Sequence, residues 1–513
     1  MSISNKTFNH LKTGCLTLFL ALCIGSTAFA QHRGDDLAFQ GIDELRDYDV
    51  QAMAMGNAYT SLSGELASLF YNPAGLATLD RFAISVSVNT FEKKWHENQE
   101  YRPNRLFVTL PFYLEELYIP DPTHIDTLTG LPMWDSDLAI DSSYQVQLPE
   151  TGLQPFSEQA ADWVNQEKGM VLNSVAFAYP LEVMKKGLVL SAAYKNNYNV
   201  LDFDRNETYL DPHLGYTKYN MPERVSGLDT IRVNWYRYMR QRTGNFHTAR
   251  VGLGVELSKQ VQIGFGMTIL NGETEDVQSL DQHGYFDLAD QNRFRFGYAL
   301  SSTQYSGTST FSSVSANIGG IYHFENFALG VNVLLPRTLT REWDYSQTVT
   351  DSSGSKTLNR TGTDEMSLPP QFTFGFHLTP SDIFLFSLDY QFTPFSNAEF
   401  DFADANTDTT HNAWVDQHIL RFGAQFKLLD YLTLLGGYQY IPQTFVPDGS
   451  AFRDRGPAAN SYSMGLSLDL YDWGRIDVSY EMRKLRYYDQ YSSNTNYNVI
   501  DLNNLSIGYS YMF

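Results

Sequence analysis

Cysteine is nearly absent from this 513-residue chain, and long apolar runs are absent from all but its first residues. Its two cysteines, Cys15 and Cys23, both stand within residues 1–30, which have the features of a removable leader. Without that leader the chain has no cysteine, which excludes a disulfide framework, a CxxC metal site and a cysteine nucleophile. After Ala30 no segment approaches about 18 consecutive apolar residues, so the sequence predicts no transmembrane helix.

Basic residues are also scarce. The chain has 36 Lys and Arg against 58 Asp and Glu, which gives a formal net charge of −22. The leader contains Lys6, Lys12 and no acid, so the balance without it is 34 to 58, or −24. Nucleic-acid binding needs a basic surface, so we expect no nucleic-acid partner. An acidic surface is compatible with an environment rich in divalent cations.

Motifs for catalysis and cofactor binding are missing as well. The 11 histidines are scattered without an HExxH pattern, and no serine or histidine stands in a recognisable hydrolase motif. Gly252 and Gly254 lie within a strand pattern with no following helix, which argues against a nucleotide-binding loop. The acidic stretch 401–408 lacks EF-hand spacing and is better explained as a solvated loop. We therefore predict no enzyme activity, no catalytic residues, no metal site and no cofactor.

The first 30 residues have the three parts of a secretory signal peptide. Lys6 and Lys12 form a positive n-region, residues 16–24 (LTLFLALCI) form the apolar h-region, and residues 28–30 (AFA) form a small-x-small cleavage site. The apolar run is too short to span a bilayer comfortably, which disfavours a membrane anchor. We expect export of the chain, with Gln31 as the first residue after cleavage.

Aromatic residues are abundant, with 33 Tyr and 34 Phe, and apolar side chains recur with period two along much of the chain. Aromatic enrichment favours β-structure. The alternation gives each segment one apolar face and one face of small, polar or charged residues. The clearest alternating segments are 82–88, 249–257, 261–269, 462–470 and 476–482.

A soluble β-sandwich shows the same alternation, so strand length and connections decide between the two classes. The segments are about ten residues long, which suits a tilted strand that crosses a bilayer. Tight turns such as 258–260 alternate with long polar stretches, as in outer-membrane barrels. We expect these stretches to be loops: 121–165, 201–230, 340–367 and 442–460.

We therefore predict an all-β fold, a transmembrane antiparallel β-barrel over residues 81–513 with long polar extracellular loops. About seventeen segments qualify as strands, but a bacterial barrel has an even number, so some must belong to loops or a plug. The expected location is the outer membrane of a diderm bacterium, where outer-membrane lipids surround the barrel.

The end of the chain carries a local signal for this class. Gly508, Tyr511 and Phe513 follow the order of a glycine and then two aromatics at alternate positions, with Phe513 as the last residue. This pattern resembles the C-terminal assembly signal of outer-membrane barrels. We therefore expect the barrel assembly machinery as a partner during biogenesis.

Residues 31–80 precede the first alternating segment and do not alternate themselves. The part from Val50 to Leu69 is helix-like, so we predict a small N-terminal helical hatch inside the barrel. The next motif, Asn72-Pro73-Ala74 followed by Gly75, has turn chemistry because Pro fixes φ and Gly accepts positive φ. Apolar residues flank this turn, which predicts burial in the barrel, and Asn72 can then hydrogen-bond backbone groups left unpaired there.

These stretches together resemble the FadL/OmpP1/TodX family of outer-membrane transport proteins. Residues 53–59 (MAMGNAY) and 67–76 (ASLFYNPAGL) resemble the family's N-terminal hatch, and residues 367–392 and 419–440 resemble two hairpins of its C-terminal half. The resemblance implies an Asn-Pro-Ala motif in a hatch ahead of a fourteen-stranded barrel. This chain is longer than typical members, chiefly through polar loops such as 121–165.

The resemblance implies an outer-membrane channel for long-chain fatty acids or other small hydrophobic compounds, with hatch-gated diffusion and lateral exit into the bilayer. Met53, Met55, Phe70 and Tyr71 are candidates for an apolar ligand path, or they only pack the plug against the wall. The hatch motif at 72–74 is either a gate or a fixed seal. An alternative function is a barrel subunit of a protein secretion or surface-assembly system that binds protein cargo.

Overall fold

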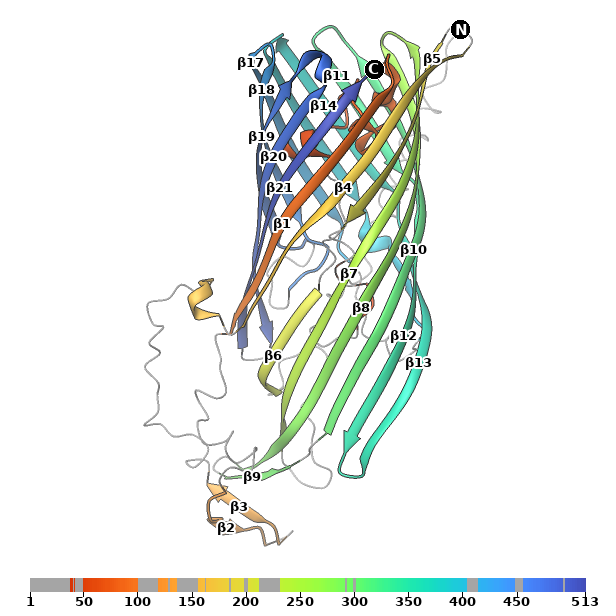
Figure 1. The fold of residues 1–513 in the computed structure, drawn as a ribbon. Helices are drawn as coiled ribbons and strands as arrows, with labels where there is room; N and C mark the ends of the chain where they lie inside the picture. The colour runs from red at the N-terminus through yellow and green to blue at the C-terminus, as the bar shows by residue number, and fades with distance from the viewer. Residues whose placement is uncertain are drawn as a thin grey trace, which may run out of the picture.

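The chain forms a closed antiparallel β-barrel in a computed structural model (Figure 1). The predicted signal peptide, residues 1–30, lies outside the described residues. The structure describes residues 37–39, 41, 49–99, 119–127, 130–135, 156–161, 163–183, 186–197, 202–211, 231–290, 293–298, 301–403, 414–447, 455–491 and 494–513.

Fourteen strands of the described residues make up the closed ring, which confirms the predicted antiparallel β-barrel and the strand number that the resemblance implied. The ring closes between the first and last strands, where Ala83 lies opposite Met512 and Gln99 lies opposite Asn496. In ring order the strands are β1 (Ala83–Gln99), β4 (Trp163–Val183), β5 (Lys186–Asn197), β7 (Ile231–Ser258), β8 (Val261–Asp290), β10 (Ser301–His323), β11 (Phe327–Leu334), β14 (Gln371–Ser381), β15 (Phe384–Thr393), β17 (Gln417–Leu429), β18 (Leu432–Pro442), β19 (Ala458–Asp469), β20 (Arg475–Tyr491) and β21 (Asn494–Met512).

The alternation of the sequence places apolar side chains outside the barrel and polar side chains inside it. On β8, Ile263, Phe265 and Ile269 are 42–46% exposed on the outer face, whereas Gln262 and Thr268 are buried on the inner face. This is the reverse of a soluble protein, because hydrocarbon surrounds the outer face. We call the outward apolar band around the ring the lipid belt. No helix among the described residues is long and apolar enough to cross a membrane.

The two ends of the barrel differ. One end has tight turns, such as those at 259–260 and 430–431, and it also holds the start of β1 and the chain's last residue (Figure 1). We call this the short-turn end, and it corresponds to the periplasmic side of an outer-membrane barrel. At this end the ring of Phe82 lies 5.2 Å from that of Phe513 and 6.2 Å from that of Tyr179, as expected for interfacial aromatics.

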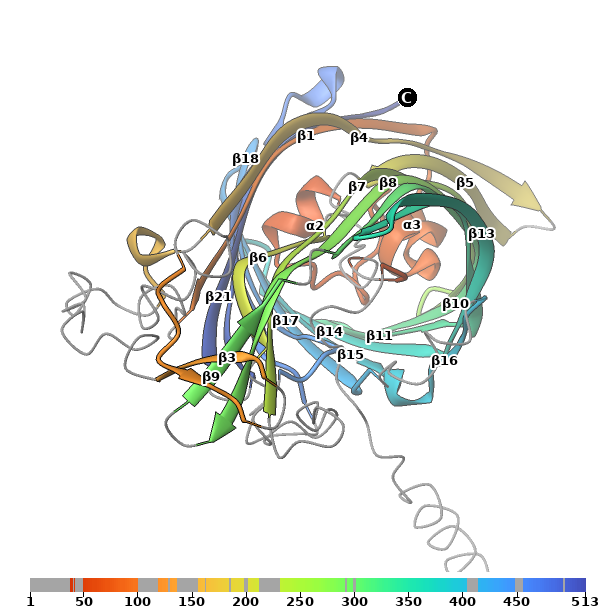
Figure 2. The same cartoon turned by 90° about the horizontal axis from the view of Figure 1, so that it is seen from below.

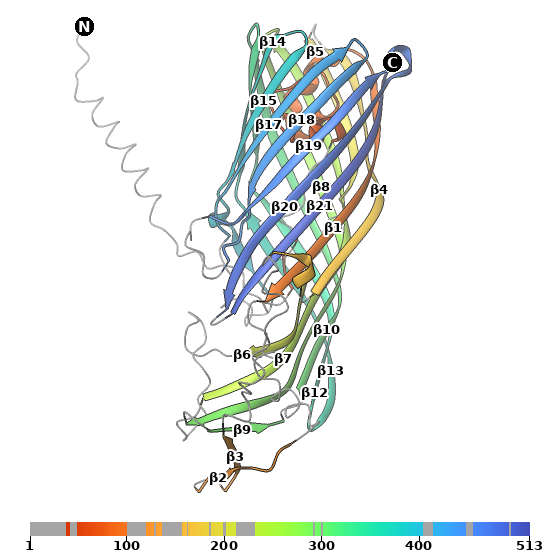
Figure 3. The same cartoon turned by 90° about the vertical axis from the view of Figure 1, so that its left-hand side faces the viewer.

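The other end extends far beyond the ring. β7 has 28 residues and β8 has 30, and β10 continues along them. The short strands β3 (Pro132–Asp135) and β9 (Arg293–Gly297) pair at the tip of this extension (Figure 3). The remaining short strands are β2 (His124–Ile125), β6 (Asp202–Asp211) and β16 (Glu399–Asp401).

The prediction of a loop over 340–367 is wrong. This stretch forms most of the hairpin β12 (Arg337–Asp351) and β13 (Gly354–Leu368), which continues the sheet from β10. Leu335-Pro336 separates β11 from β12, and Pro369-Pro370 separates β13 from β14, because proline has no N–H for the ladder. The sequence of this hairpin lacks the alternation of a membrane-crossing strand because the hairpin lies beyond the lipid belt, where neither face needs an apolar side chain.

Residues 49–80 lie within the ring of strands at the short-turn end (Figure 2). Their helices are shorter than the helix-like pattern of 50–69 predicts. The helices are α2 (Val50–Ala54), α3 (Ser68–Tyr71) and the 3-10 helix η2 (Pro73–Thr78). Glycines at 56 and 64 have positive φ and break the helical path between α2 and α3. We call residues 49–80 the plug. Further 3-10 turns are η5 (Glu158–Ala160), η6 (Phe395–Asn397) and η7 (Tyr471–Trp473).

Candidate functional site

The Asn-Pro-Ala motif fastens the plug to the wall. Asn72 is fully buried, and its Nδ2 donates to the carbonyl of Thr60 at 2.7 Å and to those of Gly320 and Val331 at 3.3 Å. Its Oδ1 accepts from the backbone N–H of Ala74 at 3.1 Å, which caps η2 with Pro73 in the first turn. One amide side chain therefore satisfies backbone groups of the plug and of strands β10 and β11.

The wall makes room for this motif with glycine. A Cβ added at Gly319 would lie 1.8 Å from Asn72 Oδ1, and one added at Gly264 would lie 2.2 Å from the N atom of Ala74. Real side chains do not tolerate such distances, so the plug's backbone approaches the wall only where the strand residue lacks a Cβ. Pro73 and Ala74 therefore lie directly against strands β8 and β10.

Carboxylates hold the plug at two further points. Oδ2 of Asp389, on β15, accepts hydrogen bonds from the backbone N–H groups of Tyr59 and Thr60, both at 2.9 Å. Four strands further round the ring, Arg475 of β20 makes a two-pronged ion pair with Glu65 at 2.6 and 2.9 Å. Charge-assisted bonds of this kind are stronger than neutral ones, so the plug is firmly attached at two separate points of the ring.

Asp49 caps the start of α2 beside this ion pair. Its Oδ1 accepts from the N–H groups of Gln51 and Ala52 at 3.0 and 3.3 Å. Burial, and then the negative charge of Asp477, raises the pKa of Asp49 from 3.8 to about 6. The cap therefore changes its charge in the mildly acidic range.

The four residues predicted for a ligand path fall into two pairs. Met53 and Met55 are 1% and 0% exposed, and Met55 packs with Tyr59 and Leu435 between the plug and the wall. Phe70 and Tyr71 instead line a cavity above the plug. The hydroxyl of Tyr71 donates to Asn57 Oδ1 at 2.5 Å, which fixes its ring at the cavity floor.

This lumen cavity has a volume of about 290 Å³. The plug forms its floor, and an apolar cluster toward the extended end forms its ceiling. The floor includes Asn57, Thr60, Phe70 and Tyr71. The ceiling includes Leu339, Met366, Leu368, Phe395 and Trp414. The cavity is therefore amphipathic, with an apolar cluster toward the extended end and polar side chains elsewhere in its lining.

Arginine is the one charged residue type among the described residues that line this cavity, although the chain is strongly acidic. Arg250, Arg337 and Arg421 reach it from strands β7, β12 and β17. Arg421 donates to Gln391 Oε1 at 2.6 Å, and Arg250 donates to Thr268 Oγ1 at 2.8 Å. A lining that has several cations and no acid suits a ligand with an anionic group.

Phe70 lies between two cations of the wall. Arg250 lies 5.4 Å from the centre of its ring, and Lys195 lies 5.6 Å from it. Arg250 also donates to the backbone carbonyl of Phe70 at 2.9 Å. Cation–π contacts strengthen when they are shielded from water, and Lys195 is only 1% exposed. We call these three residues the Phe70 clamp.

Residues 37–39 close the lumen on the far side of the apolar ceiling. Phe39 is 1% exposed and packs with Phe246, Phe311 and other members of the ceiling cluster. The backbone N–H of Leu37 donates to Gln278 at 3.3 Å, and the carbonyl of Ala38 accepts from Arg242 at 2.8 Å. A small pocket of about 50 Å³ remains beside them. The cavity thus lies between two segments of the chain's own N-terminal region.

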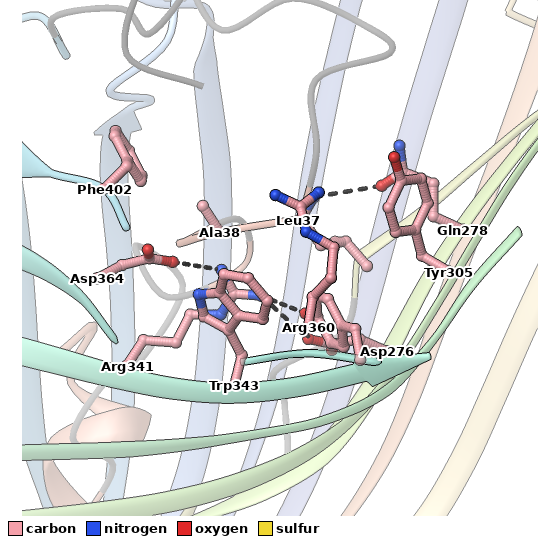
Figure 4. A pocket seen from close by; sticks show the side chains of 11 residues that line it. Leu37, Ala38, Asp276, Gln278, Tyr305, Arg341, Trp343, Arg360, Asp364 and Phe402 are labelled. Carbon is pink, nitrogen blue, oxygen red and sulfur yellow. Dashed lines mark hydrogen bonds and ion pairs between the residues drawn. The ribbon is translucent and has the colours of Figure 1, made fainter. Parts of the chain in front are cut away.

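A buried ion network supports this closure (Figure 4). Arg242 makes a two-pronged pair with Asp276 at 2.7 and 2.8 Å, and Arg341 pairs with Asp364 at 2.7 Å. Arg341 also lies 3.7 Å from Asp276, and Tyr345 donates to the same carboxylate at 2.5 Å. Strands β7, β8, β12 and β13 each supply one charged member of the network.

The wall beside the cavity has an interruption. β4 pairs with β5 from Val183 as far as Ser174, where Ser174 faces Lys195 of the clamp. Beyond that point, over residues 163–173, the described part of β4 has a strand partner only in β1. β6 pairs with β7 at this height (Figure 1). The hydrogen-bonded ladder therefore ends next to the Phe70 clamp.

The C-terminal signal residues lie at the short-turn end. Phe513 N–H donates to the carbonyl of Phe82 at 2.9 Å, and its ring lies 4.6 Å from that of Tyr511. At Gly508 an added Cβ would lie 3.0 Å from Val50 of α2, so this glycine faces the plug. Their role in assembly remains a prediction.

Sequence reasoning missed the arginines of the cavity and Lys195. Each stands singly within a strand, and only the register of the barrel brings them together around the cavity and Phe70. A signal existed for Arg250, a long cation on the inward side of the alternating segment 249–257. No group of three or more His, Cys, Asp or Glu in the described ranges could hold a metal ion.

A scan of protein-family models and a search of curated proteins found no match to this chain. Among solved structures, the P. putida toluene transporter TodX matches with a TM-score of 0.53 and 13% identity, over 91% of this chain and 99% of that one. A Pseudomonas aeruginosa FadL homologue matches with a TM-score of 0.52 and 10% identity, over 94% and 99%. Identities this low establish the fold alone, and at that level the predicted resemblance is confirmed.

Proposed function

We propose that this barrel, which has the fold of FadL/TodX outer-membrane channels, transports small hydrophobic compounds that carry an anionic head, with long-chain fatty acids as the leading candidates. The lumen cavity carries the proposal. The cavity combines an apolar ceiling with three arginine side chains, of which Arg250 lies beside the floor, and the described lining contains no Asp or Glu. A hydrocarbon tail suits the first surface and a carboxylate the second.

The head-group part of the proposal distinguishes this barrel from a channel for neutral hydrocarbons. The matched TodX is a toluene transporter, and toluene has no charge. The guanidinium groups that line this cavity can form charge-assisted contacts with an anionic head group, and a neutral ligand offers none. We infer that the lining favours amphipathic anions over neutral hydrocarbons.

The route out of the cavity is the second part of the proposal. The plug closes the way to the short-turn end through Asn72, Asp389 and Arg475, so passage straight through requires its movement. The interruption of the β4 ladder next to Lys195 offers a sideways route. An apolar tail leaves more favourably into hydrocarbon than into water. We propose that release of the Phe70 clamp opens this lateral path.

Binding by the purified barrel tests the head-group claim. The fluorescence of Trp414, in the cavity ceiling, is followed while a fatty acid or an alkane of equal chain length is added, and Trp414→Phe identifies its signal. We expect tighter binding of the acid, and Arg421→Gln should weaken it about tenfold through loss of one charge-assisted contact. The same substitution should leave alkane binding unchanged. Equal affinities for acid and alkane would contradict the proposal.

A protein-binding role is the second candidate, in which the barrel serves a secretion or surface-assembly system and holds protein cargo. One observation favours it: the long extension of β7, β8 and the β12–β13 hairpin presents a broad polar sheet beyond the lipid belt. Gentle extraction from native membranes, followed by mass spectrometry, separates the two candidates. A bound fatty acid supports transport, and a stoichiometric protein with an empty lumen supports cargo binding.

A further inference from the structure

The outer face of the barrel carries a groove that none of the proposed transport steps uses. It has a volume of about 450 Å³ and lies across strands β4, β5, β7 and β8. Its sides are Phe177, Leu190, Val251 and Phe265, each 46–53% exposed on the outer face. We call it the lipid-face groove.

The register of the strands explains the groove. Ala192 lies opposite Phe177 of β4 on one side and opposite Val251 of β7 on the other. Along its own strand, the outward neighbours are Leu190 and Tyr194. One small side chain among four large ones leaves a hollow, and the backbone groups beneath it are paired in the ladder. The occupant therefore needs no hydrogen-bonding groups at this point.

The position of the groove identifies the leaflet that it faces. Tyr179 lies at the end of the groove that is nearest the short turns. Its ring makes an edge contact with that of Phe82, and the ring of Phe82 contacts that of Phe513. These aromatics mark the membrane interface at the short-turn end, where phospholipid head groups of the periplasmic leaflet lie. The groove runs from this interface into the lipid belt and is continuous with it.

We propose that the lipid-face groove is a binding site for one acyl chain of a phospholipid from the periplasmic leaflet. The belt is in contact with lipid in any case, and the hollow at Ala192 adds a place where a chain contacts protein on three sides. The head group of this phospholipid then lies among Tyr179, Phe82 and Phe513. This site does not depend on what the lumen transports.

Native mass spectrometry tests the site. The barrel is purified in a mild detergent with palmitoyl-oleoyl phosphatidylethanolamine added, and the retained lipids are counted. We expect one lipid to remain on the unchanged barrel as detergent increases. Ala192→Trp fills the hollow and should lower that occupancy about tenfold, since the burial of two or more methylenes is lost.

Leu434→Trp is the matched control. Leu434 also points outward near a short turn, but it is already a large side chain and lies between two others, Phe426 and Leu466. Retention of the lipid by this variant, with its loss from Ala192→Trp, supports the site. Equal retention by both variants, or no retained lipid on the unchanged barrel, overturns it. Full retention by Ala192→Trp with slower uptake of a labelled fatty acid also overturns it, and assigns the groove to the departing ligand.

Discussion

Arg250 contacts Phe70 twice, with a hydrogen bond of 2.9 Å to its backbone carbonyl and a cation–π contact of 5.4 Å to its ring. A single wall residue thus fixes both the main chain and the side chain of the plug at the cavity floor. Lys195 adds the second cation on the ring, from the strand whose ladder with β4 ends beside it. The contact between Phe70 and Lys195 therefore joins the plug to the wall at the point where the β4–β5 ladder ends.

Removal of the Phe70 ring should loosen the plug. Phe70→Ala is expected to reduce the free energy of unfolding by about 3 kcal/mol, because a large buried ring is replaced by a void. Planar-bilayer conductance should rise and heat resistance should fall. Phe422→Ala, in the lipid belt, serves as the control. If fatty-acid binding survives Phe70→Ala unchanged, Phe70 only packs the plug and is not part of the ligand path.

Loss of the Asn72 amide should have a comparable effect through hydrogen bonds. Asn72→Ala removes the amide donor from the buried carbonyl of Thr60 and from two strand carbonyls and removes the cap of η2, at a cost of about 1–3 kcal/mol. Gly319→Ala should produce the same leak by forcing Asn72 away from the wall. Uptake of a small hydrophilic dye by vesicles measures both. The double variant should leak little more than either single one, and fully additive leaks would contradict this shared cause.

Plug attachment should depend on pH through Asp49. Because the folded state raises the pKa of Asp49 to about 6, it binds a proton more tightly than the unfolded state does. Its contribution to stability is therefore complete below pH 4 and is lost as pH rises through 6. Protease cleavage of the plug should be slower at pH 5 than at pH 7. Asn caps helices as well as Asp does, so Asp49→Asn should remove this difference by stabilising the plug at pH 7 by about 1–2 kcal/mol.

The closure at residues 37–39 should depend on Asp276. Asp276→Ala leaves Arg242 and Arg341 buried without their shared carboxylate, which should cost about 3–5 kcal/mol. Gel mobility of the barrel before and after heating measures the loss. The neighbouring Glu275→Ala is the control, since that side chain is on the exposed outer face. A loss of the same size in both variants would argue against a special role for the network.

Much of the barrel could be predicted because its lipid-facing strands must alternate. The segments at 261–269 and 462–470 lie in β8 and β19 with their apolar residues outward, and the turn at 258–260 joins β7 to β8. The burial of the Asn-Pro-Ala turn could also be predicted, since apolar residues flank it in the sequence. These features are local, and each is recorded in a few consecutive residues.

The parts that escaped prediction depend on distant pairing or on the absence of lipid. The β12–β13 hairpin is a regular antiparallel ladder, but its residues do not alternate between apolar and polar, because both its faces lie outside the hydrocarbon. The Phe70 clamp joins residues from three separate segments, and no local pattern reports that they meet. The plug is mostly turns because glycines with positive φ interrupt the helix that its composition suggests.

The lengths of β7 and β8 also determine where a solute first meets this protein. Thirty residues of β8 extend about 100 Å, or about 70 Å of height at a tilt near 45°. The hydrocarbon core of a bilayer takes up only about 30 Å of that height. The rest, about 40 Å, projects beyond the hydrocarbon on the side away from the short turns. A solute that approaches the barrel on this side therefore meets protein well before it meets the bilayer.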